Sequence, residues 1–283
     1  MTRRLAVLVA LLASLAAQPG LSAQAQRIIS IIPATTEMLF AMGAGDRVVA
    51  VGTYDRFPPE VAQLPRVGAL LDPDVERIIT LRPDLVVLYG TQADLRTQLD
   101  RAGIPSYPYV HRGLSDIAET IRALGGRVGM QRQADGVADH LQLELAHIRA
   151  RVAGKPRPRT LLIFGRDPGT LRNINSSGGV GFLHDMLVAA GGDDVFADVR
   201  QQAVTTSTEM ILARSPDVII ELRYTRAERA AASDSRVWNA LSSVPAVRDR
   251  RIYVLEGEEF VIPGPRVGMA AERLARALHP EVW

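Results

Sequence analysis

The fold of this protein is decided by a stretch that occurs twice. It reads ERIITLRPDLVV from Glu76 to Val87 and EMILARSPDVII from Glu209 to Ile220. The two copies align without a gap, share Glu, Ile, Pro and Asp, and both close on aliphatic residues. A repeat of such a long period predicts two similar lobes and not a solenoid of short units.

A second repeated pair extends the duplication toward the start of each half. EMLFAMGAGD begins at Glu37, and DMLVAAGGDD begins at Asp185. The spacing of this pair differs from that of the first pair, so the two halves are related but carry loops of different length.

Each half alternates strands with helices. The apolar runs of strand type are Ile28–Ile32, Val48–Val51, Leu85–Tyr89 and Ser106–Val110, then Leu161–Phe164, Val218–Ile220 and Ile252–Leu255. Apolar runs without alternation are typical of parallel strands that are covered on both faces. Since helical patterns lie between the runs, the predicted fold class is α/β, with each lobe a small α/β sandwich.

The repeated stretch also predicts where its helices begin and end. Asp74 and Ser207 stand two residues before the shared Glu, where their side chains can accept from free helix N–H groups. The helices should stop near Arg82 and Ser215, because a residue before proline avoids the helical region.

One long helix is predicted between the lobes. Gly125, Gly126 and Gly129 interrupt the segment before it, but Gln131–Val152 reads as a single helix with Leu141, Leu145, Ile148 and Val152 on one face. The expected organisation is an N-terminal lobe at 26–127, a connecting helix at 128–154 and a C-terminal lobe at 155–283. A single rigid helix that joins two lobes allows only small movements between them.

Residues 1–25 have the layout of a secretory signal peptide. Arg3 and Arg4 precede the apolar run Leu5–Ala17, and the small-residue triplet Ala23–Ala25 ends the segment. The run is short for a membrane span, although a retained anchor is the alternative. We therefore expect cleavage after Ala25 and a location in the periplasm.

Charge and cysteine content exclude several classes of function. Without residues 1–25 the chain has equal numbers of basic and acidic side chains, which argues against a nucleic-acid or anionic-membrane partner. The absence of cysteine excludes disulfides, thiol catalysis, thiolate metal sites and a lipid-anchor cysteine.

The usual catalytic motifs are absent as well. There is no Gly-x-Ser-x-Gly elbow, and Gly154-Lys155 is followed by proline, which rules out a phosphate loop. The Gly-rich stretch Asn175–Met186 is interpreted as a loop that enters a helix near Gly181. The histidines are scattered, and His111, which follows a strand end, is the one that could face a ligand. We expect no enzyme, no catalytic residue and no resident metal or cofactor.

Aromatic and basic side chains gather where predicted strands end. They are Tyr54, Phe57, Tyr89, Arg166, Arg172, Arg223, Tyr224 and Phe260. In parallel α/β sheets the ligand crevice lies at the carboxyl ends of the strands, so these residues are expected to line one cleft between the lobes. Aromatic faces with a few charged groups suit a large, flat, partly polar ligand.

Glu76 and Glu209 have two interpretations. Each lies near a helix N-terminus, where a carboxylate is stabilised by the helix dipole. The duplication also places one glutamate on each lobe, where a dimeric partner with paired arginines could receive both. Both interpretations can hold together.

With these residues in place, the chain resembles the periplasmic cobalamin, haem and iron–siderophore binding proteins of ABC importers. The matching segments are RIISIIPATTEMLFAMGAGDRVVAVG, YDRFPPEVAQLPRVG and DVERIITLRPDLVVLYG in the first half, and FLHDMLVAAGGDDVFADV and STEMILARSPDVIIELR in the second. The resemblance implies that the Tyr54–Phe57 loop lines a corrinoid pocket. It also implies that Glu76 and Glu209 dock onto arginines of an inner-membrane permease dimer.

The resemblance leaves the ligand open. The Tyr-x-x-Phe-Pro-Pro loop is nearest to the cobalamin type, which makes cobalamin or a related corrinoid the leading expectation, bound by a monomer. Haem is the alternative, with Tyr54 as a possible axial ligand. A ferric siderophore is the other, with Arg166, Arg172 and Arg223 against an anionic chelate. A free-metal carrier and an interaction protein with an empty cleft are the remaining hypotheses.

Overall fold

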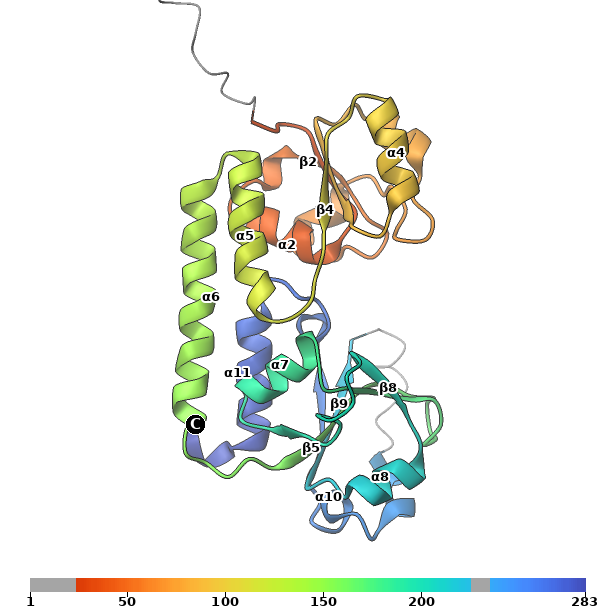
Figure 1. Ribbon diagram of the computed structural model, residues 1–283, viewed down its shortest axis with the longest axis vertical. Helices are drawn as coiled ribbons and strands as arrows, with labels where there is room; N and C mark the ends of the chain where they lie inside the picture. Colours follow the sequence, from red (N-terminus) through yellow and green to blue (C-terminus); the bar gives the residue numbers. More distant parts are fainter. Residues whose placement is uncertain (1–23, 225–234) are drawn as a thin grey trace, which may run out of the picture.

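The computed structural model describes residues 24–224 and 235–283. It shows two α/β lobes stacked end to end, with one long helix, α6, running along both (Figure 1). Most of the predicted signal peptide, residues 1–23, lies outside the described residues. Within the described part, no helix is both long and apolar enough to cross a membrane.

The N-terminal lobe is built on a four-stranded sheet in the order β2-β1-β3-β4, in which every pairing is parallel. Its strands are β1 (Ile28–Ser30), β2 (Val48–Val51), β3 (Leu85–Tyr89) and β4 (Ser106–Tyr109). Its helices are α2 (Pro33–Ala41), α3 (Val75–Thr80), α4 (Ala93–Arg101) and α5 (Ser115–Val128), with short 3₁₀ turns at η1 (Gly45–Arg47) and η2 (Pro59–Gln63). The expected parallel sheet of this lobe is confirmed.

The C-terminal lobe has a sheet in the order β10-β9-β5-β6-β8, and β7 also pairs with β5. Its strands are β5 (Arg159–Gly165), β6 (Ile174–Ser177), β7 (Asp193–Asp194), β8 (Ala203–Thr206), β9 (Val218–Arg223) and β10 (Ile252–Glu256). Its helices are α7 (Phe182–Ala189), α8 (Thr208–Arg214), α10 (Pro245–Arg248) and α11 (Val267–Leu278), with 3₁₀ turns at η3 (Ser235–Leu241), η4 (Glu258–Phe260) and η5 (Pro280–Val282). Strands β5, β9 and β10 repeat the positions of β1, β3 and β4.

Part of the second sheet differs from the prediction. The stretch interpreted as a loop from Asn175 onward begins inside β6, which pairs antiparallel with both β5 and β8. These strands are short and rich in Ser, Thr and Asn, so no apolar run marks them in the sequence. The predicted helix start is confirmed, because Gly181 is the N-cap residue of α7.

The repeated stretch folds alike in both lobes. The Asp74 carboxylate and the Ser207 hydroxyl each accept from the backbone N–H three residues further on, at 3.0 and 3.3 Å. Helices α3 and α8 end as predicted, and Arg82 and Ser215 both adopt positive φ, 47° and 49°. The N-caps of the two helices are therefore the same, and in both copies the residue before the shared proline has positive φ.

The likeness continues into the strand that follows each helix. The Asp84 carboxylate accepts from the Arg27 backbone N–H at 2.8 Å, and Asp217 accepts from the Arg159 N–H at 3.0 Å. Each aspartate thereby ties the start of one parallel strand to its neighbour. The duplication predicted from sequence thus extends to individual hydrogen bonds.

Helix α6 (Gln131–Val152) has the predicted bounds and joins the two lobes through a common core. Its buried residues alternate at spacings of four and three along one face, and they are Ala134, Ala138, Leu141, Leu145, Ile148 and Val152. They belong to one apolar cluster that contains residues of both sheets, such as Val87 and Leu162. Figure 1 shows α5 beside α6 in the upper lobe and α11 beside it in the lower lobe.

The sequence suggested that the glycines before α6 interrupt the segment. In the structure they do not interrupt a helix. Helix α5 continues through Gly125 and Gly126 and ends at Gly129, which adopts φ +70°. A Cβ atom on Gly125 would lie 2.1 Å from the Ala134 side chain of α6. Gly125 therefore serves the close packing of α5 on α6, and Gly129 terminates the helix.

Candidate functional site

A cavity of about 430 Å³ lies between the lobes at the ends of their strands. It is lined by His111, Phe164, Phe182, Leu183, Gln202, Ala203, Tyr224, Val261 and Pro263. His111 follows β4 of the N-terminal lobe, and the other residues come from the C-terminal lobe. The volume is within the usual range for small-molecule pockets, and most of the lining is apolar or aromatic.

His111 is the titratable imidazole among the residues that line this cavity. Its ring stacks on Tyr109 at 6.2 Å between centroids and meets the edge of Phe182 at 5.7 Å. Both ring nitrogens are buried, and neither has a hydrogen-bond partner among the described residues. Burial lowers the pKa of His111 more than the carboxylates of Asp116 and Asp185 raise it. The neutral imidazole therefore carries one donor and one acceptor nitrogen, and protein atoms cover both of them.

Two tyrosines continue the aromatic surface away from His111. Tyr89 and Tyr109 are directly paired in the register of β3 and β4. Tyr89 is half-buried, and Tyr109 is buried with a hydroxyl that has no partner in the described part of the chain. Tyr89 was predicted at this strand end; Tyr109 was not.

The Tyr54–Phe57 loop reaches across to the C-terminal lobe. Tyr54 is 65% exposed and Phe57 is 40% exposed, so neither ring belongs to the core. Arg56 pairs with Glu258 at 3.1 Å, and the Arg266 guanidinium lies 4.0 Å from the centre of the Phe57 ring. The loop thus contacts the segment between residues 258 and 266, which also supplies Val261 and Pro263 to the cavity.

Asp55, in the middle of the same loop, is buried. Its side chain has no hydrogen-bond partner among the described residues, although the Thr36 hydroxyl and the Arg66 guanidinium are near. Burial raises the pKa of Asp55 to about 7, against smaller lowering effects of Thr36 and Arg66. Sequence reasoning missed this residue, because nothing local shows which of four loop residues turns inward.

Two of the predicted arginines are engaged inside the C-terminal lobe. The Glu221 carboxylate accepts from Arg166 at 3.0 Å and from Arg223 at 2.9 Å, and both guanidiniums are buried. Burial alone would raise the pKa of Glu221, but hydrogen bonds from Arg166, Arg223 and Trp238 hold it below its usual value. Neither Arg166 nor Arg223, both predicted to bind the ligand, lines the cavity described above; the two share one carboxylate inside the lobe.

The other predicted ligand residues fall into different environments. Phe260 is fully buried in the main apolar cluster, so its predicted place on the cleft wall is wrong. Arg172 is exposed, next to β6, and does not line the cavity. Tyr224 lines the cavity as predicted. Phe164 and Phe182 were missed, although Phe164 ends a predicted strand and Phe182 begins a predicted helix.

Glu76 and Glu209 occupy matching exposed sites. Each is the second residue of its helix, α3 or α8. The Ser207 side chain is the main cause that lowers the pKa of Glu209, so this carboxylate is ionised at neutral pH. α3 contacts α4, and Figure 1 shows α4 and α8 on the side of their lobes that is remote from α6. Both glutamates remain available for a partner.

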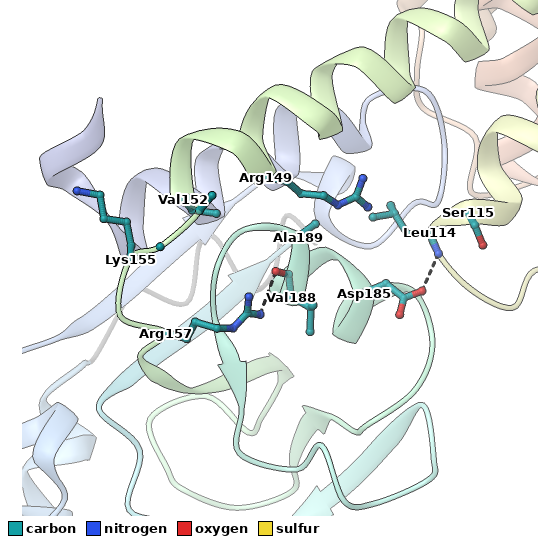
Figure 2. A pocket seen from close by; sticks show the side chains of 11 residues that line it. Leu114, Ser115, Arg149, Val152, Lys155, Arg157, Asp185, Val188 and Ala189 are labelled. Atoms are coloured by element: carbon teal, nitrogen blue, oxygen red, sulfur yellow. Dashed lines mark hydrogen bonds between the residues drawn. The ribbon is translucent and has the colours of Figure 1, made fainter.

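A second cavity, of about 520 Å³, lies against the C-terminal end of α6 (Figure 2). Its charged side chains are Arg149, Lys155, Arg157 and Asp185. Asp185 accepts from the Leu114 backbone N–H at 2.9 Å, and Arg157 donates to the Val188 carbonyl at 3.1 Å. The lining contains no aromatic ring, so this cavity does not suit a flat aromatic or macrocyclic ligand.

Two similar α/β lobes, a bridging helix with a shared core and a cavity between strand ends define a solute-binding receptor. The family comparison agrees with this class. The family model described as "Periplasmic binding protein" matches residues 28–259, and the chain belongs to that family.

Three individual proteins are similar to nearly the whole of this chain. The vitamin B12-binding protein of Salmonella typhimurium is 33% identical over 273 residues, which cover 95% of this chain and 96% of the relative. The solved periplasmic vitamin B12 binding protein BtuF of Vibrio cholerae has a TM-score of 0.77 and 26% identity over 90% of this chain and 97% of its own. The periplasmic heme-binding protein RhuT from Roseiflexus has a TM-score of 0.77 and 25% identity over 91% and 99%. Members of this family are substrate-binding transport proteins and not enzymes.

Proposed function

We propose that this protein captures cobalamin or a related corrinoid in the cleft between its lobes and delivers it to an ABC importer. In this proposal it works in the periplasm as a monomer, performs no chemistry, and docks on an inner-membrane permease dimer through Glu76 and Glu209. The relative with 33% identity over nearly the whole chain is a vitamin B12-binding protein, which supports the choice of ligand.

The observation that carries the proposal is the cavity between the lobes. Its walls are aromatic and aliphatic, and its one imidazole is neutral and unpartnered among the described residues. Such a lining favours a bulky ligand that is mostly apolar and carries a few hydrogen-bonding groups or a metal centre. In this proposal the exposed ring of Tyr54 adds a further aromatic contact to the ligand.

Haem is the second candidate, and a specific observation favours it. A neutral imidazole nitrogen at His111 is a common ligand for iron, and Tyr54 offers an exposed phenol. A ferric siderophore has less support, because Arg166 and Arg223 are buried and both already donate to Glu221.

The test is retention of a coloured ligand by the mature chain. Residues 26–283 are incubated separately with cyanocobalamin, haemin and a ferric siderophore, desalted, and examined by absorbance. A retained corrinoid spectrum is the expected result. A retained haem band without corrinoid would transfer the proposal to haem, and loss of all three ligands would overturn it.

A pair of histidine variants shows whether retention depends on the cavity. His111→Ala should weaken binding by roughly tenfold, since it removes the only imidazole on the cavity wall. His147→Ala is the matched control, because His147 is exposed on α6 and does not line this cavity. Equal retention by both variants would contradict the assignment of the ligand to this cavity.

A further inference from the structure

Two acidic residues at equivalent positions of the repeat each cross from one lobe to the other. Glu37 on α2 and Asp185 on α7 begin the two copies of the second repeated pair. Glu37 accepts from the Arg266 guanidinium, and Asp185 accepts from the Leu114 backbone N–H. Leu114 and Arg266 are the N-cap residues of α5 and α11, the α-helices that follow β4 and β10. The lobes are thus joined by a crossed pair of related contacts.

The two contacts differ in what supplies the donor. Figure 2 shows the bond of Asp185 to Leu114, which uses a backbone N–H that any residue except proline would provide. The bond of Glu37 to Arg266 depends on one particular side chain. Substitutions of Arg266 therefore change the second contact, whereas at Leu114 only proline would remove the first.

The contact between Glu37 and Arg266 has a fixed geometry. Arg266 Nε lies 2.9 Å from Glu37 Oε2, and Nη2 lies 2.5 Å from Oε1. The Glu37 side chain is 2% exposed, and that of Arg266 is 18% exposed. A bidentate, charge-assisted pair of this kind sets the plane of the guanidinium as well as its position.

The same guanidinium holds the loop that carries Tyr54 and Phe57. It lies over the Phe57 ring at 4.0 Å, while the neighbouring Arg56 pairs with Glu258 at 3.1 Å. Glu258 and Arg266 bound the segment that supplies Val261 and Pro263 to the cavity between the lobes. Two successive residues of the loop, Arg56 and Phe57, therefore contact the two ends of that segment.

We propose that Arg266 is a positioning residue, which seats the Tyr54–Phe57 loop over the cleft by fixing Phe57 against the opposite lobe. Anchored on Glu37, the guanidinium holds the ring in place before a ligand arrives, so less ordering is needed on binding. The consequence for ligand affinity rests on the proposed function; the seating of the loop does not.

Arg273 offers a matched control for this role. It pairs with Glu259 and lies over the Phe260 ring at 4.6 Å, so it also combines an ion pair with an aromatic contact. All of its partners belong to the C-terminal lobe. Replacing it removes similar interactions without releasing the Tyr54–Phe57 loop.

The first measurement is amide hydrogen exchange of the ligand-free mature protein over residues 52–58. Arg266→Gln should speed exchange there by roughly tenfold, and Arg273→Gln should leave it unchanged. Since Arg266→Gln leaves the Glu37 charge buried without its partner, the double variant Glu37→Gln with Arg266→Gln is measured as well. It leaves no unpaired buried charge and should show the same faster exchange. Unchanged exchange in both Arg266 variants would overturn the proposal.

The second measurement is the Kd for cyanocobalamin. Arg266→Gln should raise it by roughly tenfold, Arg266→Lys should give an intermediate value because lysine keeps the charge without the planar fork, and Arg273→Gln should match the unaltered protein. Equal Kd values for all variants would contradict the proposal that Arg266 positions the Tyr54–Phe57 loop for ligand binding. If the unaltered protein does not bind cyanocobalamin, the proposed ligand is wrong, and the exchange experiment alone decides the role of Arg266.

Discussion

At the scale of single residues, the carboxyl group of Asp55 makes the stability of the Tyr54–Phe57 loop depend on pH. It lies between two exposed residues, yet its side chain is buried. The groups that act on it are the Thr36 hydroxyl, the Arg66 guanidinium and the Glu37 carboxylate. Because burial outweighs the favourable contacts, the folded protein binds a proton at Asp55 up to about pH 7.

This shift predicts the sign of a stability change. The pKa of Asp55 is about 7 in the folded state and close to its ordinary value of 3.8 when unfolded, so the folded state holds more protons between these values. The free energy of unfolding should therefore fall as pH rises through this range and level off above it. Asp55→Asn removes this dependence and should be more stable than the unaltered protein at about pH 8, by at most about 4 kcal/mol.

Urea unfolding at about pH 4.5 and about pH 8 checks this prediction. Asp100→Asn is the control, because Asp100 is exposed on α4. The control should retain the pH dependence of the unaltered protein. An equal pH slope in the unaltered protein and in Asp55→Asn would show that Asp55 does not carry the effect.

At the scale of elements, α3 and α8 present one glutamate each in the same way. Both helices are capped by a side chain two residues before the glutamate, and in both copies the residue before the shared proline has positive φ. The caps fix the start of each helix, and with it the position of Glu76 or Glu209. A dimeric partner with twofold symmetry would present the same surface to each lobe, so it would require Glu76 and Glu209 to be held in the same way.

Replacing both Glu76 and Glu209 with alanine should weaken docking on the importer and leave ligand binding intact. Affinity for cyanocobalamin should stay nearly unchanged, because neither residue lines the cavity between the lobes. Uptake through a reconstituted importer should fall by roughly tenfold, since charges at an interface rim chiefly govern association. Asp94→Ala, which removes another exposed acid from the first turn of a helix, should leave uptake intact. Loss of ligand binding in the double variant would refute the docking role.

At the scale of the whole molecule, the shared core along α6 limits movement between the lobes. Side chains of α6 belong to the same apolar cluster as residues of both sheets. The crossed contacts of Glu37 and Asp185 add two further ties. A large rotation of one lobe would have to expose part of this core to water, at about 25 cal/mol for each Å².

We therefore expect only small closure when the ligand binds. Small-angle scattering of the free and cyanocobalamin-bound protein should give radii of gyration that agree within about 1 Å. A change of several Å, or profiles that fit only a large rotation of the lobes, would contradict the description of α6 as a rigid connection.

Prediction from sequence succeeded where the signal was local. The bounds of β2, β3 and α6 agree with the expected ones, because continuous apolar runs and helical periodicity mark them. Prediction failed for β6 and β8, whose polar residues become strands only through pairing with each other and with β5. Strands of this kind have no signature until the sheet has formed.

The candidate site shows the same division. The strand-end rule predicted both Tyr224, which lines the cavity, and Phe260, which is buried in the core, and it could not distinguish the two. It also could not show that Arg166 and Arg223 share the Glu221 carboxylate. Which way a side chain points beyond a strand end depends on packing against residues far away in the chain.

The amino-acid sequence by itself determined the duplication, the α/β class, the helix caps and stops, and the long connecting helix, since all of these follow from local periodicity and residue chemistry. Only the tertiary structure decided which side chains line the cavity, that Asp55 is buried, and that Arg266 ties the Phe57 loop to Glu37, 229 residues away. The physical reason is that burial and pairing are properties of surfaces brought together by folding, and no local pattern records the partner.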